Sequence, residues 1–214
     1  IRYKDYLTFN VKPMNFKHTG VFPEQAANWD FIRDKVASAG RPVRVLNLFA
    51  YSGGATLAAA AGGAEVFHVD ASKGMVAWAK ENAQASGLAD RPIHWIVDDC
   101  GKFIQREIRR GRRYDGIIMD PPSYGRGPSG EIWKMETSFY PFLLETAKLL
   151  TDNPLFVIIN SYTTGLAPSA VGYASDVVFG ATHGGKTEVG ELGLPVSNSS
   201  CILPCGATGR WFSE

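Results

Sequence analysis

Glycines and an acidic residue follow two of the apolar runs in this sequence, and their types suit the binding of a nucleoside. Gly53 and Gly54 let backbone approach a ligand, and the free amides of a helix that starts there attract a carboxylate. Asp70 follows the next run, where a carboxylate can accept hydrogen bonds from both hydroxyls of a ribose. A tight turn and a helix cap are the structural alternatives. Because Ser72 can cap that helix, we expect Asp70 to be available for a ligand.

A third apolar run ends in Asp98-Asp99-Cys100. One of these carboxylates can accept a hydrogen bond from an adenine amino group, and the amide that follows can donate to a ring nitrogen. A simple helix cap by Asp99 is the competing role.

The most distinctive segment is Asp120-Pro121-Pro122-Ser123-Tyr124, directly after the apolar run Gly116-Ile117-Ile118-Met119. Two successive prolines restrict the backbone and lack amide donors, so their carbonyls remain available as acceptors. With Asp120 these carbonyls can hold an amine, and the ring of Tyr124 can stack on a flat acceptor. A structural double-proline turn is the alternative, but it explains neither the acid before it nor the aromatic after it.

These residues must be positioned by short β-branched runs that alternate with helical patterns, an arrangement typical of parallel strands joined by crossover helices. The expected strands are Val43 to Leu48, Glu65 to Val69, Ile93 to Val97, Tyr114 to Met119 and Leu155 to Asn160. The expected helices are Ala55 to Ala61, Lys73 to Ser86, Lys102 to Arg110 and Thr137 to Leu150, with another from Pro23. In such sheets ligands bind beyond the carboxyl ends of the strands, where all four segments lie.

The two ends of the chain are less regular. Lys186 to Leu194 and Cys201 to Leu203 are expected to form a closing antiparallel hairpin, and Tyr3 to Val11 is expected to be an extended arm. We therefore expect an N-terminal arm over residues 1–22 and one catalytic domain over 23–214. A first residue of Ile, not Met, suggests a piece of a longer chain.

Composition excludes some classes of protein. The 214 residues carry a formal net charge of +1, so no global field indicates a nucleic-acid or membrane partner. The most apolar stretch, Val43 to Ala61, is interrupted by polar residues and glycines, so no membrane partner is expected. The three cysteines lack the spacing of a zinc or redox site, and the histidines form no cluster. We expect reduced cysteines, a cytoplasmic location and no bound metal.

In order and spacing, Asn47 to Gly54, Asp70, Asp98-Asp99 and Asp120 to Tyr124 resemble the successive motifs of class I S-adenosylmethionine-dependent methyltransferases. The closest similarity is to bacterial large-subunit ribosomal RNA methyltransferases. Lys17 to Gln25 is also similar to the segment that precedes the sheet in that family. The fold implied is α/β: a Rossmann-like, doubly wound, mostly parallel seven-stranded sheet with a C-terminal antiparallel hairpin.

The resemblance implies the cofactor S-adenosylmethionine. Ala50, Tyr51 and Gly53 would wrap its methionine part, Asp70 would hold its ribose and Asp99 would face its adenine. The full set of expected cofactor-binding residues is Gln25, Phe49, Ala50, Tyr51, Gly53, Asp70, Ala71, Ser72, Asp99 and Cys100. The expected catalytic residues, between the sulfonium and the acceptor, are Asp120, Pro121, Pro122 and Tyr124.

Three departures from the family bear on the reaction. Ala26 replaces an arginine usual after the glutamine, the customary N-terminal RNA-binding domain is absent, and Asn160-Ser161-Tyr162-Thr163 contains no cysteine. Methylation of a cytosine ring carbon requires a thiolate that first adds to the base, whereas an exocyclic amine needs no such nucleophile. We therefore expect methylation of an amine or amide nitrogen, controlled by positioning and electrostatics.

Ribosomal RNA is the favoured acceptor. A protein amide or a small molecule is the first alternative, and a non-catalytic RNA-binding module is another. A nicotinamide dehydrogenase is disfavoured because the glycines do not form Gly-x-Gly-x-x-Gly. Candidate substrate contacts are Tyr124, Arg126, Trp133 and Lys134, in and around the Gly- and Pro-rich loop Gly125 to Gly130. The basic run Arg106 to Arg113 is more typical of a solvated helix face.

Overall fold

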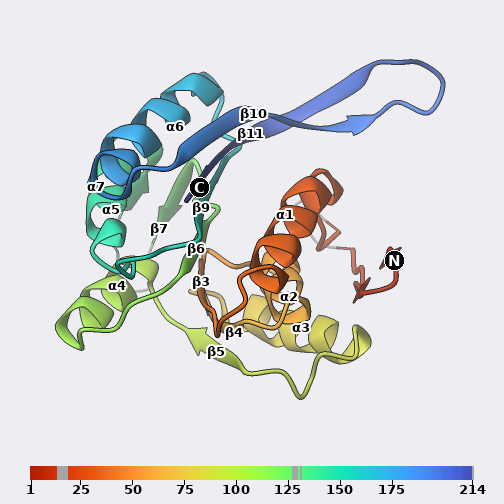
Figure 1. Ribbon diagram of the computed structural model, residues 1–214. Coiled ribbons are helices and arrows are strands. Elements are labelled where there is room, and N and C mark those ends of the chain that lie inside the picture. The colour runs from red at the N-terminus through yellow and green to blue at the C-terminus, as the bar shows by residue number, and fades with distance from the viewer. Residues whose placement is uncertain (14–18, 127–129, 131, 214) are drawn as a thin grey trace.

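A seven-stranded sheet forms the centre of the computed structural model, which describes residues 1–13, 19–126, 130 and 132–213 (Figure 1). The strand order is β10-β11-β9-β6-β3-β4-β5. These strands are β3 (Arg44–Leu48), β4 (Glu65–Asp70), β5 (Ile93–Val97), β6 (Gly116–Met119), β9 (Phe156–Ser161), β10 (Lys186–Pro195) and β11 (Ile202–Phe212). Strands β9, β6, β3, β4 and β5 pair in parallel with their neighbours in this order, and β11 pairs antiparallel with both β9 and β10.

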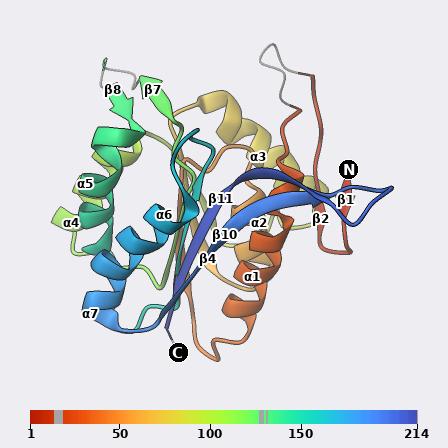
Figure 2. The same ribbon diagram turned by 90° about the horizontal axis from the view of Figure 1, so that it is seen from above.

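Helices cover both faces of this sheet (Figures 1 and 2). One face carries α1 (Ala26–Ala37), α2 (Gly54–Ala61) and α3 (Lys73–Ala85), preceded by a 3₁₀ turn over Pro23–Gln25. The other carries α4 (Cys100–Arg109), α5 (Met135–Ala147), α6 (Pro168–Ser175), a π-helical segment over Asp176–Gly180 and α7 (Ala181–His183). The arrangement is Rossmann-like and doubly wound, as expected from the sequence.

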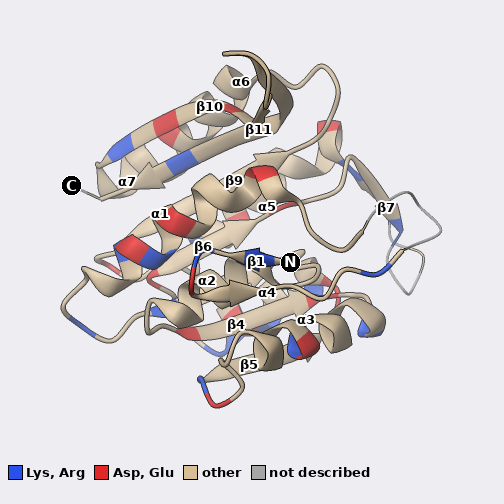
Figure 3. Ribbon diagram, turned by 90° about the vertical axis from the view of Figure 1, so that its right-hand side faces the viewer, with Lys and Arg blue, Asp and Glu red and all other residues tan. Residues whose placement is uncertain are grey.

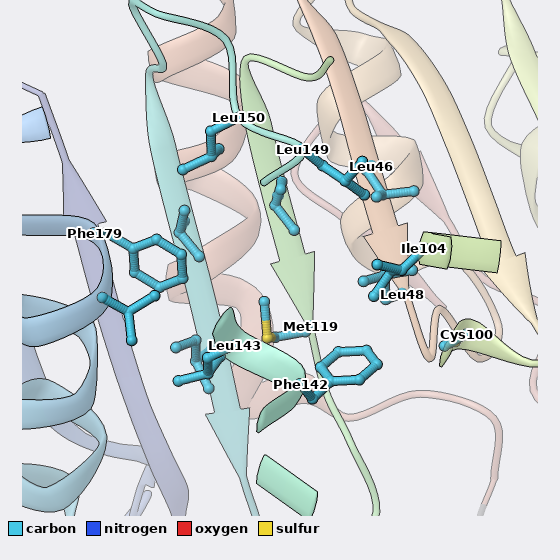
Figure 4. Packing of buried hydrophobic residues seen from close by; sticks show 14 of the residues in the cluster. Leu46, Leu48, Cys100, Ile104, Met119, Phe142, Leu143, Leu149, Leu150 and Phe179 are labelled. Atoms are coloured by element: carbon cyan, nitrogen blue, oxygen red, sulfur yellow. The ribbon is translucent and has the colours of Figure 1, made fainter. Parts of the chain in front are cut away.

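Alternate residues of the central strands point to opposite faces, because the side-chain period of a strand is two. Leu46 and Leu48 of β3 pack with α4 and α5, whereas Val45 packs with α1 and α2. Figure 4 shows the first of these cores, in which Met119 lies near Leu143 and Phe142, Leu46 near Leu149, and Leu48 near Ile104. Burial on both faces explains why these strands read as nearly continuous apolar runs.

The two ends of the chain differ most from expectation. β11 extends to Phe212, so the predicted hairpin strand Cys201 to Leu203 is only its first part. Residues 207–212 contain glycine, threonine and arginine and therefore lack the apolar run of a buried strand, although β9 pairs with them. The helices between residues 168 and 183 were not predicted. The fourth strand begins at Gly116 and not at Tyr114, which forms only an isolated bridge to Leu150.

The N-terminal segment is a short hairpin and not a simple extended arm. Its strands are β1 (Arg2–Tyr3) and β2 (Leu7–Thr8). Leu7 and Phe9 are buried, and the ring of Phe9 lies 5.0 Å from that of Trp29 in α1. The amide of Asn10 donates to Asn82 of α3. These contacts attach the segment to α1 and α3.

A second small hairpin follows the central strand β6, where the sequence indicated a loop. It consists of β7 (Tyr124–Arg126) and β8 (Ile132–Lys134), which pair antiparallel. Figure 2 shows it beside the start of α5, at the edge of the sheet where the parallel strands end. Part of the predicted loop, residues 127–129, lies outside the described residues. Within the described part of the chain, no helix is long and apolar enough to cross a membrane.

Candidate active site

A pocket opens at the carboxyl ends of the parallel strands, where all the segments singled out above converge. Its lining includes Gln25, Phe49 to Gly54, Asp120 and Asn160. Because β4 and β6 flank β3 on either side, their tips bring Asp70 and Asp120 to the same edge. The convergence expected from strand order is therefore present.

The loop between β3 and α2 has an unusual backbone. Phe49 and Tyr51 have φ angles of 54° and 49°, and Gly53 has a φ of 91°. Three of these five consecutive residues therefore have a left-handed backbone conformation. Such conformations are strained for residues with a side chain and are typical of ligand-binding turns. Gly53 precedes α2 without a side-chain cap, and Gly54 and Ala55 line the pocket. The first amides of α2 can therefore bind an anion.

Asp70 anchors this loop. Its Oδ2 accepts a hydrogen bond from the amide of Tyr51 at 2.9 Å, and its Oδ1 accepts one from the amide of Ser72 at 2.8 Å. Burial raises the pKa of the carboxyl group, and the two amides oppose this effect. Ser72 caps α3 as expected, through the amide of Met75, and Ala71 is exposed. Each carboxylate oxygen retains a second lone pair for a ligand.

A neighbouring pocket lies between the starts of α4 and α5. Phe49, Asp99, Cys100, Gly101, Ile132, Trp133 and Phe142 line it. Asp99 caps α4 by accepting from the amide of Lys102 at 2.9 Å, so the structural role considered for it is present. The buried sulfur of Cys100 accepts a hydrogen bond from the amide of Phe49 at 3.3 Å. The result is a cavity lined by three aromatic side chains together with Asp99.

Asp120 is the most perturbed carboxyl group at the site. Burial, with a smaller contribution from the nearby carboxylate of Glu24, raises its pKa to about 7. Its amide donates weakly to Leu48 at 3.4 Å. An acid poised near neutral pH can accept a hydrogen bond or a proton in a reaction.

The double-proline turn is held by two side chains that the sequence did not connect with it. The indole Nε1 of Trp133 donates to the carbonyl of Pro122 at 2.6 Å, so this carbonyl, expected to hold an amine, already has a partner. Thr163 donates from Oγ1 to Ser123 Oγ at 2.8 Å. Pro121 is buried beside Asp120. The ring of Tyr124 is 52% exposed, and its hydroxyl accepts from Arg126.

A network of polar side chains borders the pocket, and Gln25 is the member that the sequence indicated as a site residue. The hydroxyl of Tyr162 donates to Glu24 and accepts from the Gln25 amide, both at 2.9 Å. Asn28 donates to the Gln25 side-chain oxygen at 2.8 Å and to Asn160 at 2.9 Å. These residues come from segments more than 130 positions apart. The signal was a cluster of amides and acids in Glu24 to Asn28, where a helix of this length would normally bury apolar residues.

The basic run is largely paired with acids. Arg106 forms an ion pair with Asp98, and Arg110 and Arg112 both pair with Glu107, whose side chain is fully buried. In Figure 3 basic and acidic residues are interspersed along the ribbon. His18, which precedes Gln25 in the expected cofactor segment, lies outside the described residues. Within the described part, no three His, Cys, Asp or Glu side chains are grouped as metal ligands.

The family model and the relatives that match this sequence are all methyltransferases. A sequence model described as S-adenosylmethionine-dependent methyltransferase matches residues 4–151. The ribosomal RNA large subunit methyltransferase K/L of Shewanella frigidimarina (strain NCIMB 400) is 30% identical over 155 residues. The aligned region covers 72% of this chain and 21% of that protein, so the chain spans about a fifth of the length of that relative.

Solved structures agree with this result. The crystal structure of the SAM-dependent methyltransferase from Agrobacterium tumefaciens has a TM-score of 0.93 and 38% sequence identity, and covers 100% of this chain and 70% of that one. A putative methyltransferase, SMU.776, complexed with SAH has a TM-score of 0.75 at 22% identity, covering 95% of this chain and 53% of the other. At that identity the likeness concerns the fold alone.

Proposed function

This chain belongs to the family of S-adenosylmethionine-dependent methyltransferases, and from that premise we propose that it methylates an exocyclic amine of a ribosomal RNA base. Membership identifies an enzyme and its cofactor, so neither a nicotinamide dehydrogenase nor a non-catalytic RNA-binding module describes the chain. The acceptor and the roles of individual residues are the subject of the proposal.

The residues of the two pockets fit the cofactor. The uncapped start of α2 and the left-handed turn before it would hold the carboxylate and chain of its methionine part, with Gln25 opposite. Asp70 would accept hydrogen bonds from the ribose hydroxyls with its remaining lone pairs. The adenine would lie in the second pocket against the rings of Phe49 and Trp133, with Asp99 at its edge. Cys100 would contribute its amide, because its sulfur already accepts from Phe49.

When bound, S-adenosylmethionine supplies a methyl group on a positively charged sulfur, which becomes a neutral thioether after transfer. Asp120 would accept a hydrogen bond from the acceptor amine and orient its lone pair towards that methyl group. With a pKa raised to about 7, its carboxylate can also take the proton that the amine loses. Pro121 would restrict the turn, and Tyr124 would stack on the acceptor base.

The single observation that carries the choice of nitrogen is the position of the cysteines. Cys100 is buried, burial raises the pKa of its thiol, and its sulfur accepts a hydrogen bond from backbone. Cys201 and Cys205 lie on the hairpin formed by β10 and β11. In the family reaction on a ring carbon, a thiolate must attack the base beside the double-proline turn. No cysteine among the described residues lines the pocket there, whereas an amine acceptor requires none.

The ribosomal RNA acceptor is supported by the name of the Shewanella relative, a ribosomal RNA large subunit methyltransferase, and by the groups beside the turn. Tyr124 is half exposed, Ile132 is 54% exposed, and Arg126 and Lys134 lie on the same small hairpin. Aromatic faces flanked by cations are typical of surfaces that bind unpaired bases.

The decisive experiment is a methylation assay on unmodified ribosomal RNA with isotopically labelled S-adenosylmethionine, followed by mass spectrometry of the nucleosides. The expected product is an N-methylated base. A C-methylated pyrimidine would contradict the nitrogen assignment. A parallel assay supplies protein fractions as the acceptor. Label that is incorporated only there would support the alternative acceptor, a glutamine amide, for which the same turn offers the same hydrogen bonds.

A further inference from the structure

We propose that Trp133 is a positioning residue that couples occupancy of the adenine pocket to the placement of the double-proline turn. This inference rests on the proposed function, because it assumes that the cofactor and the acceptor meet at this turn. It assigns to one side chain the communication between the two halves of the site.

Trp133 contacts both halves directly. Its Nε1 donates to the carbonyl of Pro122 at 2.6 Å, and its ring lies 5.4 Å from the ring of Phe49 and 5.2 Å from that of Phe142. Both phenylalanines and Trp133 itself line the pocket proposed for adenine. A ring inserted into that pocket must therefore contact the same indole that holds the turn.

The turn depends on such external donors and acceptors for its placement. Pro121 and Pro122 have no amide hydrogens, so neither can anchor the turn by donating to a neighbouring strand. Its fixed points are the carbonyl of Pro122, held by Trp133, the carbonyl of Ser123, held by the amide of Met135 at 3.1 Å, and Ser123 Oγ. Asp120 donates a long hydrogen bond of its own to Leu48, at 3.4 Å, and the Pro122 bond is the next along the turn. Displacement of the indole is transmitted to Asp120 through two rigid prolines.

Phe49 gives the coupling a second connection. Its backbone has a φ of 54°, its amide donates to the sulfur of Cys100, and its ring packs on Trp133. The position of the Phe49 ring is therefore determined by the loop between β3 and α2 and by the start of α4. Ordering of that loop by a ligand would also order the indole.

Hydrogen exchange tests the coupling without an acceptor. The amides of Tyr124 to Arg126 and Ile132 to Trp133 are compared in the presence and absence of saturating S-adenosylhomocysteine. In the wild type we expect the ligand to slow exchange at these amides. Trp133→Phe retains a ring in the pocket and removes the donor, so at a ligand concentration that saturates this variant it should lose most of the slowing.

Trp211→Phe is the matched control. The Trp211 indole also donates to a carbonyl, that of Gly184, at 2.8 Å, and its side chain is buried. It lies near the end of β11, away from the pockets. This variant should show the wild-type slowing. Circular dichroism and thermal unfolding of both variants establish that each is folded.

Two results would overturn the proposal. One is full slowing of exchange in Trp133→Phe, and the other is equal loss in Trp211→Phe. With ribosomal RNA as acceptor and saturating cofactor, Trp133→Phe should also lower the transfer rate about tenfold. Failure of the wild type to methylate RNA would count against the proposed acceptor, while the exchange result would still decide the coupling.

Discussion

The amide of Tyr51 and the carboxylate of Asp70 are joined by a 2.9 Å hydrogen bond that ties the turn after β3 to the tip of β4. Tyr51 is left-handed, and this bond is one of the contacts that hold it in that conformation. Asp70 therefore serves the structure of the loop as well as any ligand. A substitution at this position tests both roles together.

Asp70→Asn should weaken binding of S-adenosylmethionine by roughly 10- to 100-fold, because hydrogen bonds to a charged acceptor are stronger than those to a neutral amide. Isothermal titration calorimetry measures this change. Asp90→Asn, an exposed position beyond α3, should bind the cofactor like the wild type. Unchanged affinity in Asp70→Asn would remove the residue from the ribose site.

For a residue that directly follows a strongly apolar run, the sequence predicts its place at the end of a strand. The central strands are buried on both faces, so their patterns are continuous and their ends are well marked, and Gly53, Asp70, Asp99 and Asp120 lie at one edge as expected. Strand β11 was only partly predicted because its register depends on pairing with β9 and not on its own apolar pattern.

Contacts between distant segments were beyond prediction. The bonds from Tyr162 to Glu24 and from Trp133 to Pro122 depend on which loops meet at the sheet edge. Trp133 is a candidate substrate contact from the sequence because it is aromatic and lies beside a Gly- and Pro-rich loop. In the structure its indole donates to the carbonyl of Pro122, a contact that no sequence pattern indicates.

Asp120→Asn should lower methyl transfer by about 10²- to 10³-fold, since the amide cannot take a proton and presents a weaker acceptor to the amine. Binding of S-adenosylhomocysteine should change by less than about threefold, because that ligand carries no charge on sulfur. Single-turnover assays and calorimetry measure the two effects separately. A variant that retains wild-type turnover would place the acceptor elsewhere.

The same substitution should change stability in a pH-dependent way. The pKa of Asp120 is raised to about 7 in the folded protein, so the folded state binds its proton more tightly than the unfolded state. The resulting stabilisation is complete below about pH 4 and is lost as pH rises to about 7. Relative to the wild type, Asp120→Asn should thus gain on the order of 4 kcal/mol between pH 4 and pH 8.

Urea unfolding at the two pH values measures this difference. Asp90→Asn, a substitution of the same kind at an exposed residue, is the matched control. A stability gain for Asp120→Asn of equal size at pH 4 and pH 8 would mean that the proton is not held more tightly on folding.

Comparison of Gly53→Ala with Gly63→Ala distinguishes the effect of backbone strain on stability from the effect of a changed turn on cofactor binding. Both glycines are left-handed, with φ angles of 91° and 103°, so each substitution should destabilise the fold by about 1 to 2 kcal/mol. An added Cβ at Gly53 would lie 3.0 Å from Ala79 Cβ, whereas one at Gly63 meets nothing within 4 Å. Only Gly53→Ala should weaken cofactor binding, by tenfold or more. Equal affinities of the two variants would exclude the turn from the cofactor site.

S-adenosylmethionine and S-adenosylhomocysteine should differ in the protons that they release on binding. At pH 7 Asp120 is about half protonated, and a sulfonium placed beside it would lower its pKa and expel up to roughly half a proton. The neutral thioether exerts no such pull. Calorimetry in buffers of different ionisation enthalpy measures the release. The difference between the ligands should vanish in Asp120→Asn, and if it persists there, another group must face the charged sulfur.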